Sequence, residues 1–184
     1  MIDLAITADH IRSTLTAYLD EYPGEKLDLA PALDLLGDGA DLTSRKEFQG
    51  HATAGAVLTY PNGKVLFIRH LMLDKWLLPG GHLEADDTTL VQAALRELGE
   101  ETGIRTEDVI LLRDEPIHID VHPIPANSAK GEPEHRHIDF RFLFSTNSDV
   151  VQLQTEEVTD AVWRGTDTIS DERLRARVVA AFRS

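Results

Sequence analysis

The sequence reads Leu78-Pro-Gly-Gly-His-Leu-Glu84 at a glycine-rich turn and then Arg96-Glu-Leu-Gly-Glu-Glu-Thr-Gly-Ile104 on a segment of helical character. On a helix, Glu97, Glu100 and Glu101 occupy positions i, i+3 and i+4, so their side chains converge on one face. Three carboxylates at this spacing repel one another. A hard divalent ion such as Mg²⁺ takes carboxylate oxygens as ligands and keeps positions open for water and phosphate. The pattern therefore predicts a divalent-metal site that acts on a phosphoanhydride.

These two segments resemble the box of the Nudix hydrolase (MutT-like) family, which runs Gly-x5-Glu-x7-Arg-Glu-U-x-Glu-Glu-x-Gly-U, where U is aliphatic. The second half matches at every fixed position: Arg96, Glu97, Leu98, Glu100, Glu101, Gly103 and Ile104. The first half departs from the box, because counting from Gly81 places Asp87 where the family has glutamate and leaves Arg96 one residue late. We expect the extra residue in the loop at positions 85–88, ahead of the helix.

The resemblance implies metal-dependent hydrolysis of a phosphoanhydride in a nucleoside diphosphate linked to another moiety, with an ADP-ribose-like compound or a nucleoside triphosphate as substrate. It implies Mg²⁺ or Mn²⁺ as cofactor. The implied ligands are Glu97, Glu100 and Glu101, with a backbone carbonyl from Gly80 or Gly81. One of these glutamates is also a candidate base. Arg96 lies four residues before Glu100, so it is expected to orient that carboxylate.

A protein of the same fold can instead be a catalytically silent nucleotide sensor or interaction module, because fold does not determine function. Such a module would bind nucleotide tightly without turnover, or would have lost the box glutamates. All three glutamates that follow Arg96 are present, and this favours the enzyme.

Composition narrows the class of protein further. The 184 residues are 42% hydrophobic and 27% charged, which is typical of a globular chain. The absence of cysteine excludes disulfides and a cysteine zinc site. The lack of a leader-like segment or a long apolar run predicts a cytoplasmic protein with no membrane association. A net charge of −14, from 18 basic and 32 acidic residues, argues against nonspecific nucleic-acid binding.

Residues 1–50 are expected to form an N-terminal helical extension, and residues 51–184 the Nudix hydrolase domain. Apolar spacing predicts helices over Asp9–Tyr22 and Asp28–Leu36, with Pro23-Gly24 between them. Capping the sheet, forming a homodimer interface and shaping the substrate mouth are all compatible with this extension, and the sequence does not choose among them.

The resemblance implies an α/β fold, a Nudix-type α/β/α sandwich with a central mixed sheet. A hairpin is predicted from the β-rich runs 54–60 and 64–70, which are joined through Pro61-Asn62-Gly63. The box helix is predicted over Thr88–Glu101, with Gly99 inside it. A last helix is predicted over Asp171–Phe182.

Two further runs alternate polar and apolar residues as strands do. Ile117–His122 places His118, Asp120 and His122 on one face, and the run from His137 to Arg141 alternates in the same way. The two runs are expected to pair across the loop at residues 123–136. Their polar face has two readings of equal weight, a substrate cleft or a solvent-exposed sheet face.

In the cleft reading, His118, His122 and Arg141 contact the substrate. A second, histidine-bound metal at His-x-Asp-x-His is a lesser alternative. By resemblance, Glu156 or Glu157 in the acidic loop before Trp163 could also reach the site as a further base or ligand.

Overall fold

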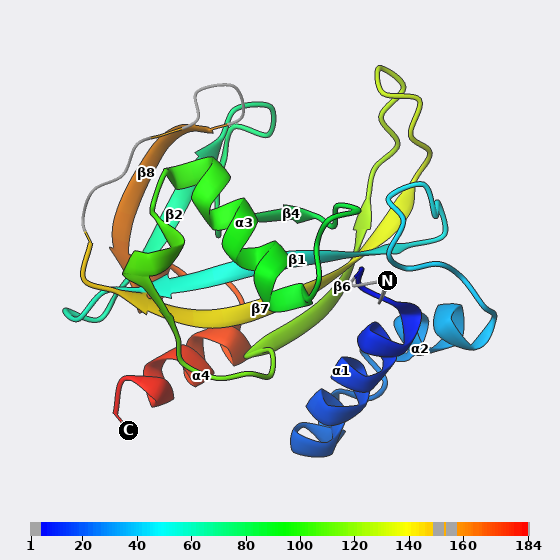
Figure 1. The fold of residues 1–184 in the computed structure, drawn as a ribbon, viewed down its shortest axis with the longest axis horizontal. Helices are drawn as coiled ribbons and strands as arrows, with labels where there is room; N and C mark the ends of the chain where they lie inside the picture. The colour runs from blue at the N-terminus through cyan, green and yellow to red at the C-terminus, as the bar shows by residue number, and fades with distance from the viewer. Residues whose placement is uncertain (1–4, 149–152, 154–157, 184) are drawn as a thin grey trace. The chain divides into compact units, whose positions relative to one another are not determined.

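The computed structural model describes residues 5–148, 153 and 158–183 (Figure 1). The chain forms two compact units, and each is described by itself. Unit 1 comprises Met1–Ala54, His82–Ala93 and Ile119–Phe140. Unit 2 comprises Gly55–Gly81, Ala94–His118 and Arg141–Ser184.

The helices are α1 (Ala8–Glu21), α2 (Ala30–Gly37), α3 (Leu90–Thr102) and α4 (Glu172–Ala181), with short 3-10 turns at Pro23–Glu25, Thr106–Asp108 and Thr166–Thr168. The strands are β1 (His51–Thr59), β2 (Lys64–His70), β3 (Lys75–Leu77), β4 (Gly80–His82), β5 (Val109–Leu111), β6 (His118–Ile124), β7 (His135–Thr146) and β8 (Val158–Gly165). The predicted α/β class, a mixed central sheet with helices beside it, is confirmed.

The sheet has the strand order β3-β2-β1-β7-β5, with β4 beside β1, β6 beside β7 and β8 beside β2. The predicted hairpin forms, because β1 and β2 pair antiparallel with Thr59 opposite Val65 around the Asn-Gly turn. The predicted pairing of the two polar runs also forms, as β6 with β7. The glycines of the turn Pro79-Gly80-Gly81 form the start of strand β4.

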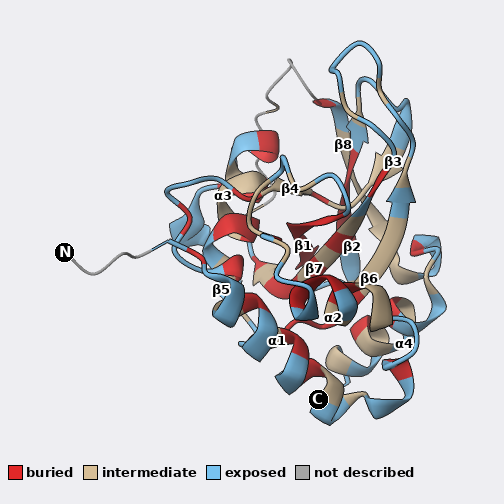
Figure 2. Cartoon of the chain, turned by 90° about the vertical axis from the view of Figure 1, so that its right-hand side faces the viewer, coloured by how far each residue is buried: buried red, intermediate tan, exposed pale blue. Residues whose placement is uncertain are grey.

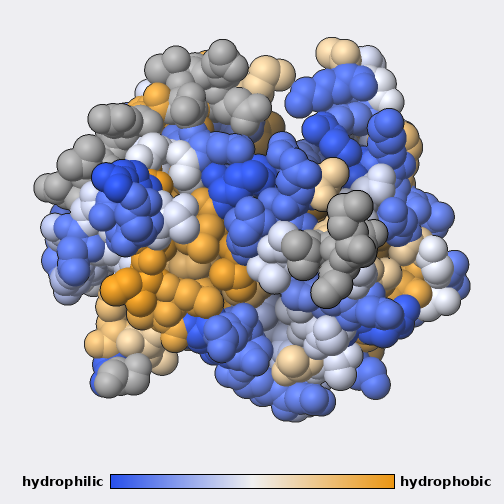
Figure 3. Space-filling view, in the orientation of Figure 1, coloured by the Kyte–Doolittle hydropathy of each residue, from blue (hydrophilic) through white to orange (hydrophobic). Residues whose placement is uncertain are grey.

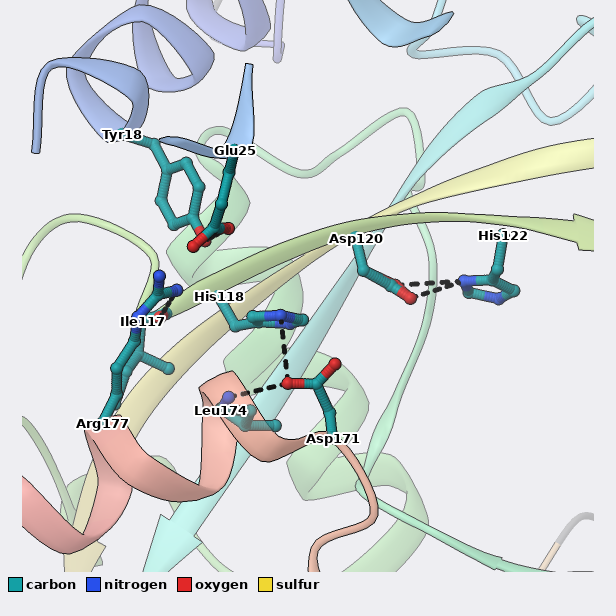
Figure 4. Close-up of polar contacts among 9 residues, drawn as sticks. All are labelled: Tyr18, Glu25, Ile117, His118, Asp120, His122, Asp171, Leu174 and Arg177. Carbon is teal, nitrogen blue, oxygen red and sulfur yellow. Dashed lines mark hydrogen bonds and ion pairs between the residues drawn. The ribbon is translucent and has the colours of Figure 1, made fainter. Parts of the chain in front are cut away.

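The apolar core of unit 2 gathers residues from its strands and from α4. Its buried members are Val57, Val65, Phe67, Ile117, Leu143, Ile169, Leu174 and Val178. Helix α4 begins where the Asp171 carboxylate accepts a hydrogen bond from the Leu174 amide at 2.7 Å, an N-cap contact. Arg177 donates to the Ile117 carbonyl at 3.0 Å, which ties α4 to the start of β6 (Figure 4).

Helices α1 and α2 of unit 1 fall within two residues of the predicted boundaries. Thr7 caps α1 by accepting a hydrogen bond from the His10 amide at 3.1 Å. Figure 2 shows the buried and exposed faces of this helix, and the buried face carries Ile11, Leu15 and Tyr18 at helical spacing. Arg12 donates to the Leu36 carbonyl at 2.9 Å, so α1 is bound to the end of α2.

The box helix α3 begins two residues later than predicted, and one side of it is buried. Leu90, Ala93, Ala94 and Leu98 are all at most 1% exposed. Gly99 lies inside this helix, where a methyl group added at Cα would meet only the Ile104 carbonyl oxygen, at 3.6 Å. That distance is an ordinary van der Waals contact, so close packing does not require glycine at this position.

We therefore expect Gly99→Ala to raise the free energy of unfolding by about 0.5–1 kcal/mol, because alanine restricts the unfolded chain and favours the helix. Chemical denaturation of the variant and the wild type measures the difference. If the variant were less stable than the wild type, the conclusion that there is room for a methyl group at Gly99 would be wrong.

The strands β3, β4 and β5 are absent from the sequence-based prediction. Each has three residues, too few for alternation to be recognised. In the described part of the chain, no helix is both long and apolar enough to cross a membrane. Figure 3 shows a face on which hydrophilic side chains border a hydrophobic patch.

Candidate functional site

Gly80 holds one glutamate of the box in unit 2. Its amide N–H donates a hydrogen bond to Oε2 of Glu101 at 2.9 Å. Glu101 is 5% exposed, and a hydrogen bond from a backbone amide stabilises a buried carboxylate in its charged form. This hydrogen bond connects the end of α3 to the glycine turn and fixes the orientation of the Glu101 carboxylate.

Gly81 makes room for a second glutamate. A Cβ at this position would lie 2.6 Å from Oε1 of Glu97 and 2.7 Å from both Cδ and Oε2. Any side chain at position 81 would consequently displace the Glu97 carboxylate. This is the physical reason for the second glycine of the turn, because only glycine permits so close an approach.

Arg96 joins Glu97 to the third glutamate. Its Nη1 atom donates to Oε1 of Glu97 at 3.0 Å and to Oε2 of Glu100 at 3.1 Å. The side chain of Glu100 is 56% exposed, whereas those of Arg96 and Glu97 are 16% and 12% exposed. The contact with Glu100 expected from the i, i+4 spacing is present, and the same guanidinium also orients Glu97.

The three glutamates thus offer carboxylate oxygens at the end of α3 beside the glycine turn. Arg96 holds the oxygens of Glu97 and Glu100, and the Gly80 amide holds that of Glu101. Hard oxygen donors, with Glu100 open to solvent, match what Mg²⁺ and Mn²⁺ prefer. Because Gly81 has no side chain, nothing at position 81 covers the Glu97 carboxylate. The three glutamates therefore provide the kind of donor atoms that the expected Mg²⁺ or Mn²⁺ requires.

Asp87, which replaces the first box glutamate, lies in the loop before α3. Its Oδ2 atom accepts a hydrogen bond from the Glu84 amide at 2.7 Å, and its own amide donates to the Glu84 carbonyl at 3.1 Å. It is 1% exposed. These contacts close the loop on itself, so the shorter acid contributes to the structure of the turn.

The polar strand residues of the prediction have other partners. His118 is 3% exposed, and its Nε2 lies 3.4 Å from Oδ1 of Asp171, the N-cap of α4 (Figure 4). In unit 1, Nδ1 of His122 lies 3.1 Å from Oδ2 of Asp120. The backbone carbonyl of Arg141 accepts a hydrogen bond from the Ile117 amide at 2.8 Å. Glu156 and Glu157 lie outside the described residues.

Unit 1 contains a group of histidines from segments that lie far apart in the sequence. Its members are His51 from β1, His82 from β4, and His135 and His137 from β7. Burial lowers the pKa of His82 to about 4 and that of His137 to about 3, and neighbouring imidazoles contribute to both shifts. Burial also lowers the pKa of His51. These three rings are therefore neutral at pH 7. The pair His135-x-His137 is visible in the sequence, whereas its partners come from distant segments.

Comparison with solved structures indicates a shared fold. A Nudix-family hydrolase from Clostridium perfringens is 24% identical with a TM-score of 0.55, and the match covers 72% of this chain and 96% of that one. A binary complex of the Ap4A hydrolase of C. elegans is 22% identical with a TM-score of 0.54, and the match covers 70% and 95%. At these identities the likeness concerns the fold.

Among curated proteins, the chain is 34% identical over 100 residues to the "Probable DHNTP pyrophosphohydrolase" of Lactococcus lactis subsp. cremoris (strain MG1363), which is 54% of this chain and 57% of that protein. It is 44% identical over 68 residues to "Phosphatase NudJ" of Escherichia coli (strain K12), which is 36% and 43%. The chain thus spans about half the length of these relatives. The family model described as "NUDIX domain" matches residues 50–182, and the chain belongs to that family.

Proposed function

We propose that this protein is a divalent-metal-dependent hydrolase of a phosphoanhydride bond in a nucleotide-like substrate. The observation that carries the proposal is the arrangement at the end of α3. Gly80 fixes Glu101 at 2.9 Å, and Arg96 holds Glu97 and Glu100 at 3.0 and 3.1 Å. The family assignment over residues 50–182 supports it.

In this proposal, Mg²⁺ or Mn²⁺ is held by Glu97, Glu100 and Glu101, with a backbone carbonyl of the glycine turn at Gly81. When bound, the ion supplies charge neutralisation for the phosphate oxygens and activation of water. It also lessens the repulsion among the three carboxylates.

The chain's own residues have distinct tasks. Arg96 orients the carboxylates of Glu97 and Glu100 through hydrogen bonds from its Nη1 atom. The Gly80 amide does the same for Glu101. Glu100 is the glutamate with 56% of its side chain exposed, so its carboxylate is the best placed of the three to accept a proton from an attacking water.

The names of the relatives indicate only a broad class of substrate, compounds that contain linked phosphates. One curated relative is named for dihydroneopterin triphosphate, abbreviated DHNTP, and a structural relative is an Ap4A hydrolase. We propose an ADP-ribose-like compound or a nucleoside triphosphate. Contacts of His118, His122, Arg141 and Glu156 with the substrate stay predictions, as do a homodimer and the absence of nonspecific nucleic-acid binding.

We expect chelation of divalent metal to abolish turnover and Mg²⁺ or Mn²⁺ to restore it, because the carboxylates alone cannot neutralise the phosphate oxygens. The assay measures phosphate or nucleoside monophosphate released from ADP-sugars, dinucleoside polyphosphates, NADH and nucleoside triphosphates. Turnover that survives complete chelation would contradict the proposal. Nucleotide binding without turnover of any compound would favour the sensor instead.

A further inference from the structure

Three histidines of unit 1 bring their ring nitrogens together. One nitrogen from each of His51, His135 and His137 lies within 4.8 Å of the other two. The Nε2 atoms of His135 and His137 are 3.3 Å apart. The ring centroid of His51 is 4.9 Å from those of both partners. His51 and His135 are buried, at 2% and 6% exposure.

Backbone carbonyls determine which nitrogen of two rings carries the proton. Nδ1 of His51 lies 3.2 Å from the Glu47 carbonyl oxygen, and Nδ1 of His135 lies 2.8 Å from that of Pro133. A carbonyl oxygen only accepts, so Nδ1–H is the donor in both rings. In the neutral form of each ring, the lone pair is therefore on Nε2. This is the arrangement found in metal-binding histidines, whose second nitrogen donates to a carbonyl that fixes the ring.

The lone pair of His51 is unsatisfied within the part of the chain that the structure describes. The Nε2 atom that carries it is buried and makes no hydrogen bond among these residues. Buried polar atoms are nearly always satisfied, so this exception calls for a partner such as an ion or an ordered water. The Nε2 atoms of His135 and His137 face each other at hydrogen-bond distance, but this contact leaves the atom of His51 unsatisfied.

The charged side chains that act on the histidine group are of both signs. Arg45 is the basic residue that acts electrostatically on His51 and His82. It forms an ion pair with Glu132 at 3.2 Å, and the glutamate acts on the same two histidines with opposite sign. Glu132 therefore offsets part of the effect of the Arg45 charge at the histidine group.

We infer that His51, His135 and His137 bind a divalent transition-metal ion of the Zn²⁺ type through their Nε2 atoms. His82, with its ring 5.2 Å from that of His51 and 5.1 Å from that of His137, is the candidate fourth ligand. Imidazole nitrogen favours zinc and its neighbours in the transition series, whereas Mg²⁺ prefers oxygen. The site is therefore chemically distinct from the glutamates of α3, and it needs no cysteine.

The test is zinc titration of tag-free protein, first stripped with a chelator and then kept in excess Mg²⁺ to occupy the carboxylates. Competition with a colorimetric zinc indicator measures stoichiometry and affinity. We expect one Zn²⁺ per chain and a rise in thermal midpoint on binding. Replacement by Co²⁺ should give the visible absorption of a four-coordinate site.

The double variant His51→Ala/His135→Ala should weaken zinc affinity by at least about 100-fold, since even loss of a supporting contact costs 10- to 100-fold. His137→Ala changes the less buried ligand and should weaken it similarly without disturbing the buried rings. His70→Ala, a histidine of β2 outside the group, is the matched control. Glu100→Gln should retain zinc.

Zinc affinity of the wild type equal to that of both variants would overturn the inference. An equally large loss of zinc affinity in His70→Ala would also overturn it. A loss of zinc affinity in Glu100→Gln would overturn it as well, because the ion would then be bound by the carboxylates. These outcomes do not depend on hydrolysis.

Discussion

Glu100→Gln is expected to lower turnover by at least about 100-fold, the lower range for loss of a group that transfers a proton in catalysis. The amide removes both a charged oxygen for the cation and the proposed proton acceptor. The thermal midpoint should hardly change, because the substitution weakens an ion pair with Arg96 in which Glu100 is 56% exposed. Relief of repulsion among the carboxylates can even raise it in metal-free protein. Product release and thermal unfolding, measured on the same preparation, provide the test.

Glu107→Gln is the matched control for this substitution. Glu107 lies in the 3-10 turn after α3 and pairs with Arg105 at the surface. It is a glutamate in an ion pair near the same helix but outside the box, so turnover should be unchanged. Full activity of Glu100→Gln would remove that glutamate from the site, and equal losses in both variants would point to a general effect of charge.

Gly81→Ala is expected to reduce activity nearly as strongly while the protein stays folded. The new methyl group would lie 2.6–2.7 Å from the Glu97 carboxylate, so that carboxylate must move. It is the far end of a flexible side chain, and the cost to stability is correspondingly small. Displacement of one ligand should raise the Mg²⁺ concentration that gives half-maximal turnover by at least about 10-fold.

Gly24→Ala serves as the comparison, because no atom lies within 4 Å of its added methyl group. It should leave both stability and the Mg²⁺ requirement close to those of the wild type. An unchanged Mg²⁺ requirement in Gly81→Ala would mean that Glu97 is not a ligand. A large fall in the thermal midpoint would mean instead that the turn itself had been disrupted.

The elements with local signals could be predicted from the sequence. The Asn-Gly turn set the hairpin of β1 and β2, and helical spacing placed α1 and α3 within two residues of their observed starts. The contact of Arg96 with Glu100 follows from the i, i+4 rule alone. In each case the determining residues lie within a few positions of one another.

What could not be predicted depends on contacts between distant segments. His51, His82 and His135 meet only because β1, β4 and β7 are brought together by the fold. The roles of Gly80 and Gly81 toward Glu101 and Glu97 likewise span the loop and the length of α3. The contact of His118 with Asp171, the N-cap residue of α4, also joins segments that are distant in the sequence. Periodicity along a chain does not report which segments become neighbours.

The central claim is that the glutamates of α3 form the hydrolytic site, and one comparison tests it most directly. Wild type and a Glu97→Gln/Glu100→Gln/Glu101→Gln variant would be assayed together for product release from the nucleotide panel with Mg²⁺ or Mn²⁺. Nucleotide binding would be measured in parallel. The account predicts turnover of at least one compound by the wild type and none by the variant, which should still be folded. Equal turnover by both proteins, or tight nucleotide binding by the wild type with no turnover of any compound, would contradict it.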